Sequence, residues 1–268
     1  MIEDSSMEIL NYLFGVQGKV VLVTGGGRGI GESIAEGFVK AGAKVYVCSR
    51  KIETCEDTAK RLSALGTCIA LPVAADIATA AGRSAVVSEI GAREEKLDVL
   101  INNAGALWAA PLAEYPESGW DKVFDLNVKG LFFLIRDLVP LLERAATKVV
   151  PARVINVGSI DGFHIPKHET YAYSASKAAS HHLSIHLADQ LAARNITVNV
   201  IAPGMFPSKM MVGTLEKQGL ARVVEKVPLK RLTSPDDMAG AAIFLASHAA
   251  SYITGAIIPV DGGIATTL

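Results

Sequence analysis

The stretch KVVLVTGGGRGIG, residues 19–31, decides the fold of this chain. A valine-rich apolar run passes directly into a glycine cluster, and helical spacing starts at about residue 29. A strand, a glycine-rich turn and a helix suit a pyrophosphate, because the helix N-terminus supplies free N–H groups and a positive dipole. We expect Gly25 to allow the tight turn, Gly29 to let the backbone approach the ligand, and Gly31 to let the helix pack close to the sheet. The alternative is a glycine-rich turn that binds no ligand. The position of the glycine cluster at the first strand-to-helix junction argues against this alternative.

Apolar runs of the same kind recur along the chain and alternate with longer segments of helical pattern. Strands that are continuously apolar are buried on both faces, as in parallel sheets. The alternation predicts an α/β fold, a single-domain Rossmann fold with a doubly wound parallel sheet flanked by helices. The expected strands are 19–24, 44–48, 68–73, 98–102, 153–157, 196–200 and 257–260, and the expected helices are about 29–42, 51–65, 78–92, 118–146, 169–195 and 235–246. Because no repeat or linker is apparent, we expect an N-terminal extension over 1–16 and one domain over 17–268.

The composition excludes several classes of protein. The chain has 268 residues, 50% of them hydrophobic and 20% charged, which is enough for a sizeable core. Its net charge of −1 does not favour nucleic-acid binding. Cys48, Cys55 and Cys68 lack paired CxxC spacing, which argues against a disulfide scaffold and indicates a reducing compartment, the cytoplasm. His182 and His186 share a helical face, but no HExxH glutamate accompanies them, so no metal is expected.

Neither a targeting signal nor a membrane span is expected. Residues 1–18 contain no Lys or Arg, whereas signal and transit peptides carry positive charge. Residues 238–260 contain no Asp, Glu, Lys or Arg over 23 positions, but Ser, His, Thr and Gly interrupt them. The Ser-Pro-Asp-Asp at 234–237 predicts a helix start, with an N-cap, a first-position proline and first-turn acids. We therefore expect a buried helix to about residue 246, a turn and a strand at 256–260.

The end of the second strand indicates which dinucleotide the chain binds. Folds of this kind place an acid there for the 2′-hydroxyl of NAD, or a cation for the 2′-phosphate of NADP. Here the strand runs into Ser49, Arg50 and Lys51, with no acid before Glu53. Arg28 in the glycine turn is placed to converge on the same phosphate, since guanidinium groups match phosphate geometry. We therefore predict NADP(H); the alternative is that Arg50 and Lys51 only begin a solvated helix.

Tyr173 and Lys177 are the strongest candidates for chemistry. They are four positions apart and share one face of a predicted helix. A tyrosine with a pKa of about 10 is a poor acid or base at neutral pH, and an ammonium beside it favours the phenolate and lowers that pKa. Ser159, fourteen residues earlier and just past the strand that ends at Val157, is placed to hold a carbonyl oxygen beside the phenol. An isolated YxxxK is usually a core tyrosine, so the assignment depends on the motifs around it.

Those motifs occur together and in order. They are TGxxxGxG at 24–31, NNAG at 102–105, Asn127, Ser159, YxxxK at 173–177, Pro-Gly at 203–204 and DGG at 261–263. With them the chain closely resembles the short-chain dehydrogenase/reductases over about residues 17–263. It is most similar to the NADPH-dependent 3-oxoacyl reductases, including the type associated with rhamnolipid synthesis. The resemblance implies a seven-stranded sheet, a homotetramer, and reduction of a small-molecule carbonyl, such as a 3-oxoacyl thioester, to a secondary alcohol.

The resemblance also assigns roles at the matching positions. Tyr173 would protonate the carbonyl oxygen as hydride arrives, and Ser159 would orient that carbonyl. Lys177 would bind the nicotinamide ribose and lower the pKa of the tyrosine, and Asn127 would hold a water of the proton relay. Asp76, after the third strand, suits the adenine amine or an N-cap. The residues expected to bind the cofactor are Gly25, Gly27, Arg28, Gly29, Ile30, Gly31, Ser49, Arg50, Asp76, Ile77, Asn103, Ala104, Gly105, Tyr173, Lys177, Pro203, Gly204, Phe206 and Ser208.

One departure from the family pattern concerns the acyl carrier. Carrier-dependent reductases tend to show a pair of arginines near the pocket entrance. Arg194 matches one of them, but Phe133 stands at the other position. Docking to an acyl-carrier protein is therefore less expected, and a free ketone or CoA thioester is equally expected as the substrate. The expected substrate wall is apolar, with two histidines that either touch substrate or face solvent: Leu107, Trp108, Phe163, His164, Ile165, His168, Met205, Phe206, Met210 and Met211.

Two other functions compete with carbonyl reduction. One is an alcohol, hydroxysteroid or sugar dehydrogenase of the same family that works oxidatively. The other is a non-enzymatic NADP-binding sensor or scaffold, which would be expected to lack Ser159, Tyr173 or Lys177. All of these residues are present, so an enzyme is the stronger prediction.

Overall fold

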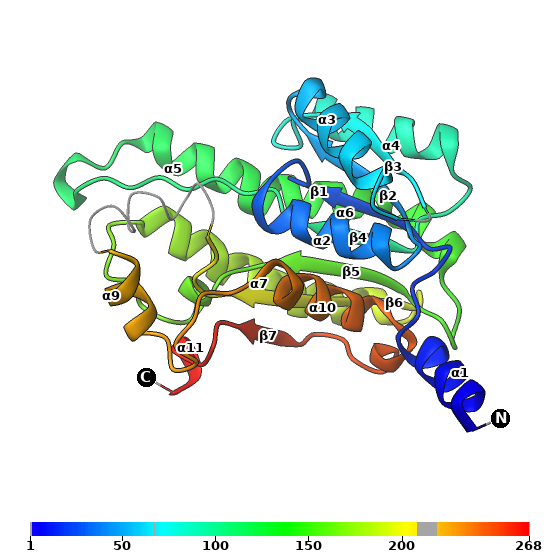
Figure 1. The fold of residues 1–268 in the computed structure, drawn as a ribbon. Coiled ribbons are helices and arrows are strands. Elements are labelled where there is room, and N and C mark those ends of the chain that lie inside the picture. Colours follow the sequence, from blue (N-terminus) through cyan, green and yellow to red (C-terminus); the bar gives the residue numbers. More distant parts are fainter. Residues whose placement is uncertain (1, 67, 208–218, 268) are drawn as a thin grey trace.

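The core of the molecule is one sheet of seven parallel strands in the order β3-β2-β1-β4-β5-β6-β7 (Figure 1). The computed structural model describes residues 2–66, 68–207 and 219–267, with side chains from residue 6 onward. The strands are β1 (Val20–Thr24), β2 (Lys44–Ser49), β3 (Ala70–Ala74), β4 (Val99–Asn102), β5 (Ala152–Val157), β6 (Ile196–Pro203) and β7 (Ile257–Val260). The order reverses between β1 and β4, and ligands of such sheets bind in the crevice at the carboxyl ends of those strands. The predicted fold class is confirmed.

Helices join the strands at the predicted places, with three additions. They are α1 (Ile2–Phe14), α2 (Gly29–Lys40), α3 (Ile52–Ser63), α4 (Ala80–Arg93), α5 (Glu117–Phe124), α6 (Leu131–Ala145), α7 (Tyr171–Ala192), α9 (Leu220–Glu225), α10 (Pro235–Ala246) and α11 (Ile264–Thr267), with 3-10 turns η1 (Leu112–Glu114), η3 (Ile160–Gly162) and η4 (His248–Ala250). The sequence pattern did not predict α1, α9 or α11. The single helix predicted over 118–146 is interrupted by a π-helical turn, η2 (Asp125–Gly130), a feature frequent at functional sites.

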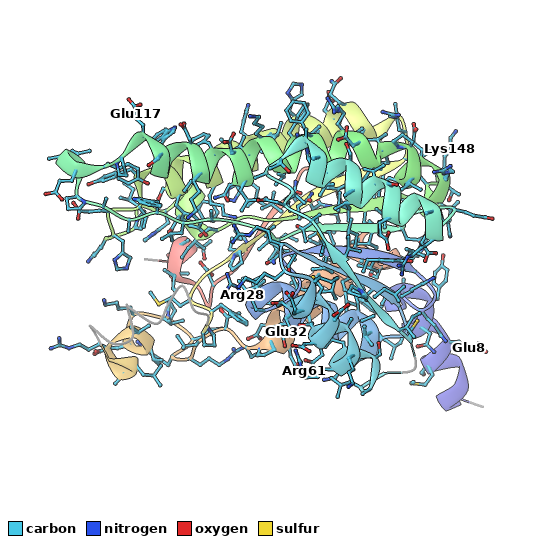
Figure 2. The ribbon with its side chains drawn as sticks, turned by 90° about the horizontal axis from the view of Figure 1, so that it is seen from above. Glu8, Arg28, Glu32, Arg61, Glu117 and Lys148 are labelled. Carbon is cyan, nitrogen blue, oxygen red and sulfur yellow. The ribbon has the colours of Figure 1, made fainter. Side chains whose placement is uncertain are left out.

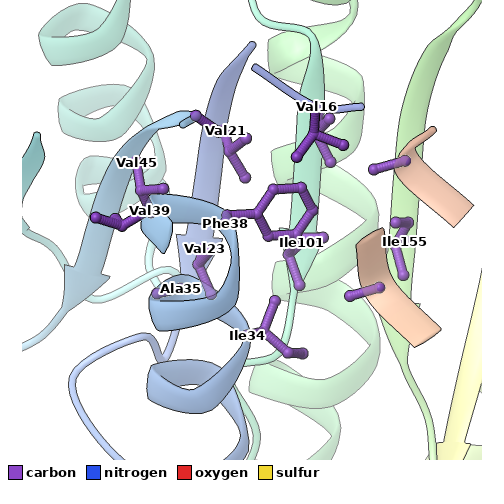
Figure 3. Close-up of a cluster of buried hydrophobic side chains, with 14 of the residues drawn as sticks. Val16, Val21, Val23, Ile34, Ala35, Phe38, Val39, Val45, Ile101 and Ile155 are labelled. Atoms are coloured by element: carbon purple, nitrogen blue, oxygen red, sulfur yellow. The ribbon is translucent and has the colours of Figure 1, made fainter. Parts of the chain in front are cut away.

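Alternate side chains of each strand point to opposite faces of the sheet, and each face has its own helical cover. Val21 and Val23 of β1 join the buried cluster formed with α2, α3 and α10, which Figure 3 shows around Phe38. Val20 and Leu22 join the cluster of the other face, which α4, α6 and α7 close. Burial of such a side chain contributes about 1.5–3 kcal/mol, so both helical layers hold β1 and the turn that follows it.

The apolar stretch at 238–260 folds as the sequence predicts. The Ser234 hydroxyl accepts the N–H of Asp237 at 3.2 Å, and the Asp237 carboxylate accepts the N–H of Ser234 at 2.7 Å, which forms a capping box at the start of α10. Helix α10 packs on α2 so closely that a Cβ on Gly37 would lie 2.5 Å from the Cβ of Ala239. Among the described residues, no helix is both long and apolar enough to cross a membrane.

Candidate active site

The glycine turn between β1 and α2 packs against the residue that follows β4. Gly25 and Gly29 have positive φ angles of 64° and 57°, which glycine adopts without strain. A Cβ on Gly31 would lie 2.4 Å from the oxygen of Gly25 and 2.3 Å from Nδ2 of Asn103. That Nδ2 donates to the main-chain oxygens of Thr24 and Gly25 at 3.0 and 3.1 Å. The tight turn and the close packing of Gly31 are confirmed, and contact with a ligand stays a prediction.

Thr24 ties together the two strands that flank the crevice. Its buried hydroxyl accepts the N–H groups of Asn103 and Ala104, both at 3.1 Å, and donates to the oxygen of Ile101 at 3.3 Å. Thr24 was not among the predicted site residues. Its position at the last residue of β1, opposite Asn102 of β4, explains why the adjoining loops are held in place.

Arg28 and Arg50, which are expected at the adenosine end of the site, are both exposed. Arg28 precedes α2, on the side of the molecule where Glu32 pairs with Arg61 at 2.6 Å (Figure 2). Among the described residues, neither Arg28 nor Arg50 has an ion-pair partner. Lys51 forms the N-cap of α3, so Arg50 lies in the connection before the helix and does not begin it.

The end of β2 and the glycine turn come together at Ser49. A Cβ on Gly27 would lie 3.6 Å from the Ser49 hydroxyl and 2.8 Å from Cγ2 of Thr54. The Ser49 hydroxyl contacts Sγ of Cys55 at 3.0 Å and donates to the oxygen of Lys51 at 3.3 Å. The glycine turn and the end of β2 are therefore adjacent, and the convergence of Arg28 and Arg50 on one phosphate stays a prediction.

Asp76 does not cap the helix that follows it. The N-cap of α4 is Thr79, whose hydroxyl accepts the N–H of Gly82 at 3.0 Å. Asp76 instead accepts the N–H of Ala78 at 3.1 Å and stays half-exposed at the crevice. This rules out the N-cap alternative and leaves adenine recognition as a prediction. Ile77 is buried in the core beneath, so only its main chain is available to a ligand.

The three residues expected to carry the chemistry are brought together by β5 and α7. Ser159 follows β5 as the N-cap of η3, and its side chain is hydrogen-bonded to Tyr173 in the first turn of α7. One turn further on, Nζ of Lys177 lies 5.5 Å from the centre of the tyrosine ring and donates to the oxygen of Val157 at 2.8 Å. This arrangement suits proton transfer by the phenol beside a positioned hydroxyl.

Burial sets the pKa values of this site. It raises the pKa of Tyr173 to about 12, against the lowering effect of the Ser159 hydrogen bond. It also lowers the pKa of Lys177 to about 8. The sequence predicted that Lys177 lowers the pKa of the tyrosine, and the direction found is the opposite. Desolvation of the phenolate dominates, and the Lys177 ammonium is bound to a main-chain oxygen rather than to the phenol.

Asn127 lies in the π-helical turn and joins three parts of the site. Its Oδ1 accepts the N–H of Ala106 at 2.8 Å, and its Nδ2 donates to the oxygen of Ala106 at 2.9 Å and to Ser176 Oγ at 3.0 Å. A Cβ on Gly105 would lie 3.4 Å from that Oδ1 and 3.9 Å from Nζ of Lys177. The structure thus shows Asn127 holding the loop after β4 against α7, and the water-relay role stays a prediction.

The segment expected to bind the nicotinamide end of the cofactor follows β6. A Cβ on Gly204 would lie 2.7 Å from the Cα of Asp261, whose carboxylate accepts the N–H groups of Gly263 and Ala265 at 2.8 and 2.7 Å. Phe206 is buried in the core. Ser208, like Met210 and Met211 of the expected substrate wall, lies outside the described residues.

The expected substrate wall is less uniformly apolar than predicted. A hollow beside α7 is lined by Trp120 and Phe163 but also by Asp161, His164 and His168. Asp161 was not predicted as a site residue, although it lies only two positions after Ser159. Burial raises the pKa of its carboxyl, while the two histidines act against that shift.

The histidines of α7 lie in different surroundings. No group of three metal-ligating side chains is found in the part of the chain that the structure describes. His182 and His186 are exposed, whereas His181 is buried and faces the loop that carries Ser159.

This fold and site define a family. A family model described as enoyl-(acyl carrier protein) reductase matches residues 25–265, and the chain belongs to this oxidoreductase family, the short-chain dehydrogenase/reductases.

Individual relatives are similar over nearly the whole chain. A rhamnolipid-biosynthesis 3-oxoacyl-[acyl-carrier-protein] reductase of Pseudomonas aeruginosa is 48% identical over 251 residues, 93% of this chain and 97% of that protein. The solved Pseudomonas aeruginosa RhlG/NADP active-site complex superimposes with a TM-score of 0.90 at 47% identity, covering 95% of this chain and 99% of that one. L-sorbose reductase from Gluconobacter frateurii, complexed with NADPH and L-sorbose, has a TM-score of 0.88 at 32% identity, over 95% and 99% of the chains.

Proposed function

We propose that the chain is an NADPH-dependent reductase that converts the ketone of a 3-oxoacyl thioester, or a related carbonyl, to a secondary alcohol. The observation that carries the proposal is the joint placement of Ser159, Tyr173 and Lys177 at the carboxyl edge of the sheet. The similarity to a 3-oxoacyl reductase at 48% identity supports this substrate class.

The residues present fit NADP(H). The close approach of Gly31 to Gly25 leaves a tight, glycine-rich turn at the N-terminus of α2, where a pyrophosphate is favoured. Arg28 and Arg50 supply exposed cations for a 2′-phosphate, and Asn103, Ala104 and Gly105 line the path toward Lys177. The similar complexes that contain NADP or NADPH support this choice of cofactor.

The protein residues divide the reaction between them. NADPH, when bound, would supply the hydride for the carbonyl carbon. The hydroxyl of Ser159 holds the carbonyl oxygen, and the phenol of Tyr173 delivers a proton to that oxygen as it gains charge. Because burial keeps the pKa of Tyr173 at about 12, the phenol is protonated at neutral pH, which suits reduction better than oxidation. Lys177 stays near the ring and positions the nicotinamide ribose.

The test is consumption of NADPH with a panel of ketones. We expect turnover with 3-oxoacyl thioesters and much weaker use of NADH. Absence of turnover with every 3-oxoacyl chain, together with turnover of another ketone class, would overturn the substrate assignment while leaving the reductase assignment intact.

A second candidate substrate class, hydroxylated ketones such as ketoses, is favoured by Asp161. A carboxylate near the catalytic hydroxyls accepts hydrogen bonds from substrate hydroxyls, which an acyl chain lacks. An Asp161→Ala variant separates the two classes. Ketose reduction should fall while 3-oxoacyl reduction is kept if hydroxylated ketones are the substrates.

The expected homotetramer is part of the proposal. Large apolar side chains are exposed on α5 and α7, including Trp120, Tyr171 and Ile185. A partner subunit that packs these two helices against its own would cover them. Light scattering should therefore give a mass well above the 28.2 kDa of one chain at micromolar concentration. A cytoplasmic location is proposed on the three cysteines, all of which are free thiols.

A further inference from the structure

His181 lies directly beneath the loop that carries Ser159. Its imidazole is buried, and its Nε2 lies 3.4 Å from the main-chain nitrogen of Ser159. Because Lys177 and His181 are four positions apart on α7, they face the same side of the helix. The imidazole therefore reaches the end of β5 one helical turn beyond the point where Lys177 reaches it.

Two glycines shape the space around this ring. A Cβ on Gly158 would lie 2.1 Å from Nε2 of His181, and a Cβ on Gly162 would lie 2.5 Å from its Cε1. These glycines lie on either side of Ser159 in the chain, so the loop closes over the imidazole from both ends. The ring of Phe163, 5.8 Å from the imidazole, completes the enclosure.

The charge state of the ring follows from its partner. A backbone N–H can only donate, so Nε2 must carry the lone pair and the proton must lie on Nδ1. Burial, and then the nearby Lys177 ammonium, lower the pKa of His181 to about 4, which keeps the ring neutral at physiological pH. At physiological pH the neutral ring is therefore able to accept the N–H of Ser159.

We infer that His181 is a positioning residue that fixes Ser159 by accepting its backbone N–H and filling the space between Gly158 and Gly162. With the main chain held there, the Ser159 hydroxyl stays aligned with Tyr173. The inference rests on the proposed role of Ser159 in holding the substrate carbonyl. Misplacing a catalytic hydroxyl affects turnover more than cofactor affinity, because most of the expected cofactor contacts lie at the glycine turn and the end of β2.

The test compares variants of His181 with and without Ser159. His181→Leu removes the acceptor, His181→Gln places an amide oxygen near the position of Nε2, and His181→Asn places its amide short of it. We expect kcat to fall about tenfold in His181→Leu and His181→Asn, and to recover in His181→Gln, with the Kd for NADPH unchanged. In a Ser159→Ala background, His181→Leu should lower kcat by less than about twofold further, because both changes remove the same function. His182→Leu, an exposed neighbour, is the matched control.

Each result bears on the inference. Equal losses from His181→Leu in both backgrounds would assign His181 to general stability, as would Gln and Asn variants that are equally impaired. If His181→Leu does not fold, the comparison of the Gln and Asn variants decides. A Ser159→Ala enzyme with unchanged turnover would instead refute the proposed function. The nitrogen chemical shifts of His181 give a test without substrate: Nε2 should be unprotonated at pH 7, and a protonated Nε2 would exclude the hydrogen bond.

Discussion

The two ends of the crevice are built on opposite principles. At the proposed adenosine end, Arg28 and Arg50 are exposed and have no ion-pair partner among the described residues. At the catalytic end, Ser159 and Lys177 are buried and hydrogen-bonded before any ligand arrives. Exposed cations have little desolvation cost and affect the affinity and choice of ligand. Buried groups have fixed geometry and shifted pKa values, and they affect the rate of reaction. Substitutions at the two ends should therefore change different kinetic constants.

Tyr173→Phe should give the largest effect. The change removes the phenolic hydroxyl and its hydrogen bond with Ser159 but keeps the ring. General acid catalysis is worth roughly 10²- to 10⁴-fold, so kcat should fall by at least that range while the Kd for NADPH changes little. Single-turnover kinetics and cofactor titration measure the two constants separately. Turnover within tenfold of wild type would exclude Tyr173 as the acid.

Arg50→Asp should give the complementary result at the other end. A carboxylate beside the 2′-phosphate removes a charge-assisted hydrogen bond and adds repulsion, which should weaken NADPH binding by about 2 to 4 kcal/mol and spare NADH. Lys60→Asp, the same charge change at an exposed position of α3, should leave both affinities unchanged. Equal binding of NADH and NADPH by the wild-type protein would contradict the roles proposed for Arg28 and Arg50.

These two ends also differ in how well sequence alone describes them. The glycine turn depends on local conformation, so the tight turn at Gly25 and the packing of Gly31 were predictable. The strands were predictable for the same reason, since continuous apolar runs such as β1 specify burial on both faces. The N-cap of α4 was not, because both Asp76 and Thr79 are good capping residues and only the backbone path decides between them.

The catalytic end was predictable in its members but not in its electrostatics. Spacing places Tyr173 and Lys177 on one helical face, yet the pKa of the phenol depends on how completely the fold desolvates it. The role of His181 was equally hidden, because its partner is the main chain of Ser159, 22 positions away. The π-helical turn at Asn127 was not predictable either, since its residues continue the helical pattern of the sequence around them.

The pH dependence of turnover sharpens the contrast between the ends. Burial lowers the pKa of Lys177 to about 8, so its ammonium is present below that pH and lost above it, while Tyr173 stays protonated. In the free enzyme, kcat/KM should therefore be flat near pH 7 and fall by about tenfold per pH unit above 8. The pH profile of kcat/KM for NADPH measures this. A rise in that constant between pH 8 and 10 would show that the neutral amine is the active form.

The smallest expected effect concerns the acyl carrier, because the arginines near the expected docking face are already paired with acidic residues. Arg194 donates to Glu143, so the one arginine that matches carrier-dependent reductases is already paired. A cation is still present near Phe133, because the guanidinium of Arg136 lies 4.6 Å from the centre of the phenylalanine ring. That arginine is itself paired with Asp137 at 2.6 Å.

A face whose cations are neutralised in this way offers little attraction to an acidic carrier protein. Charge contacts between this exposed face and a carrier protein should contribute little. We therefore expect a CoA thioester to react at least as efficiently as the same acyl chain on a carrier, with kcat/KM values within about fivefold. The experiment measures both substrates at low and at moderate salt. Glu143→Gln releases Arg194 and should improve only the carrier-bound reaction, and only at low salt, because screening removes the gain. A strong preference of the wild-type protein for the carrier, fading as salt rises, would show that Arg136 and Arg194 form a basic docking face despite their acidic neighbours.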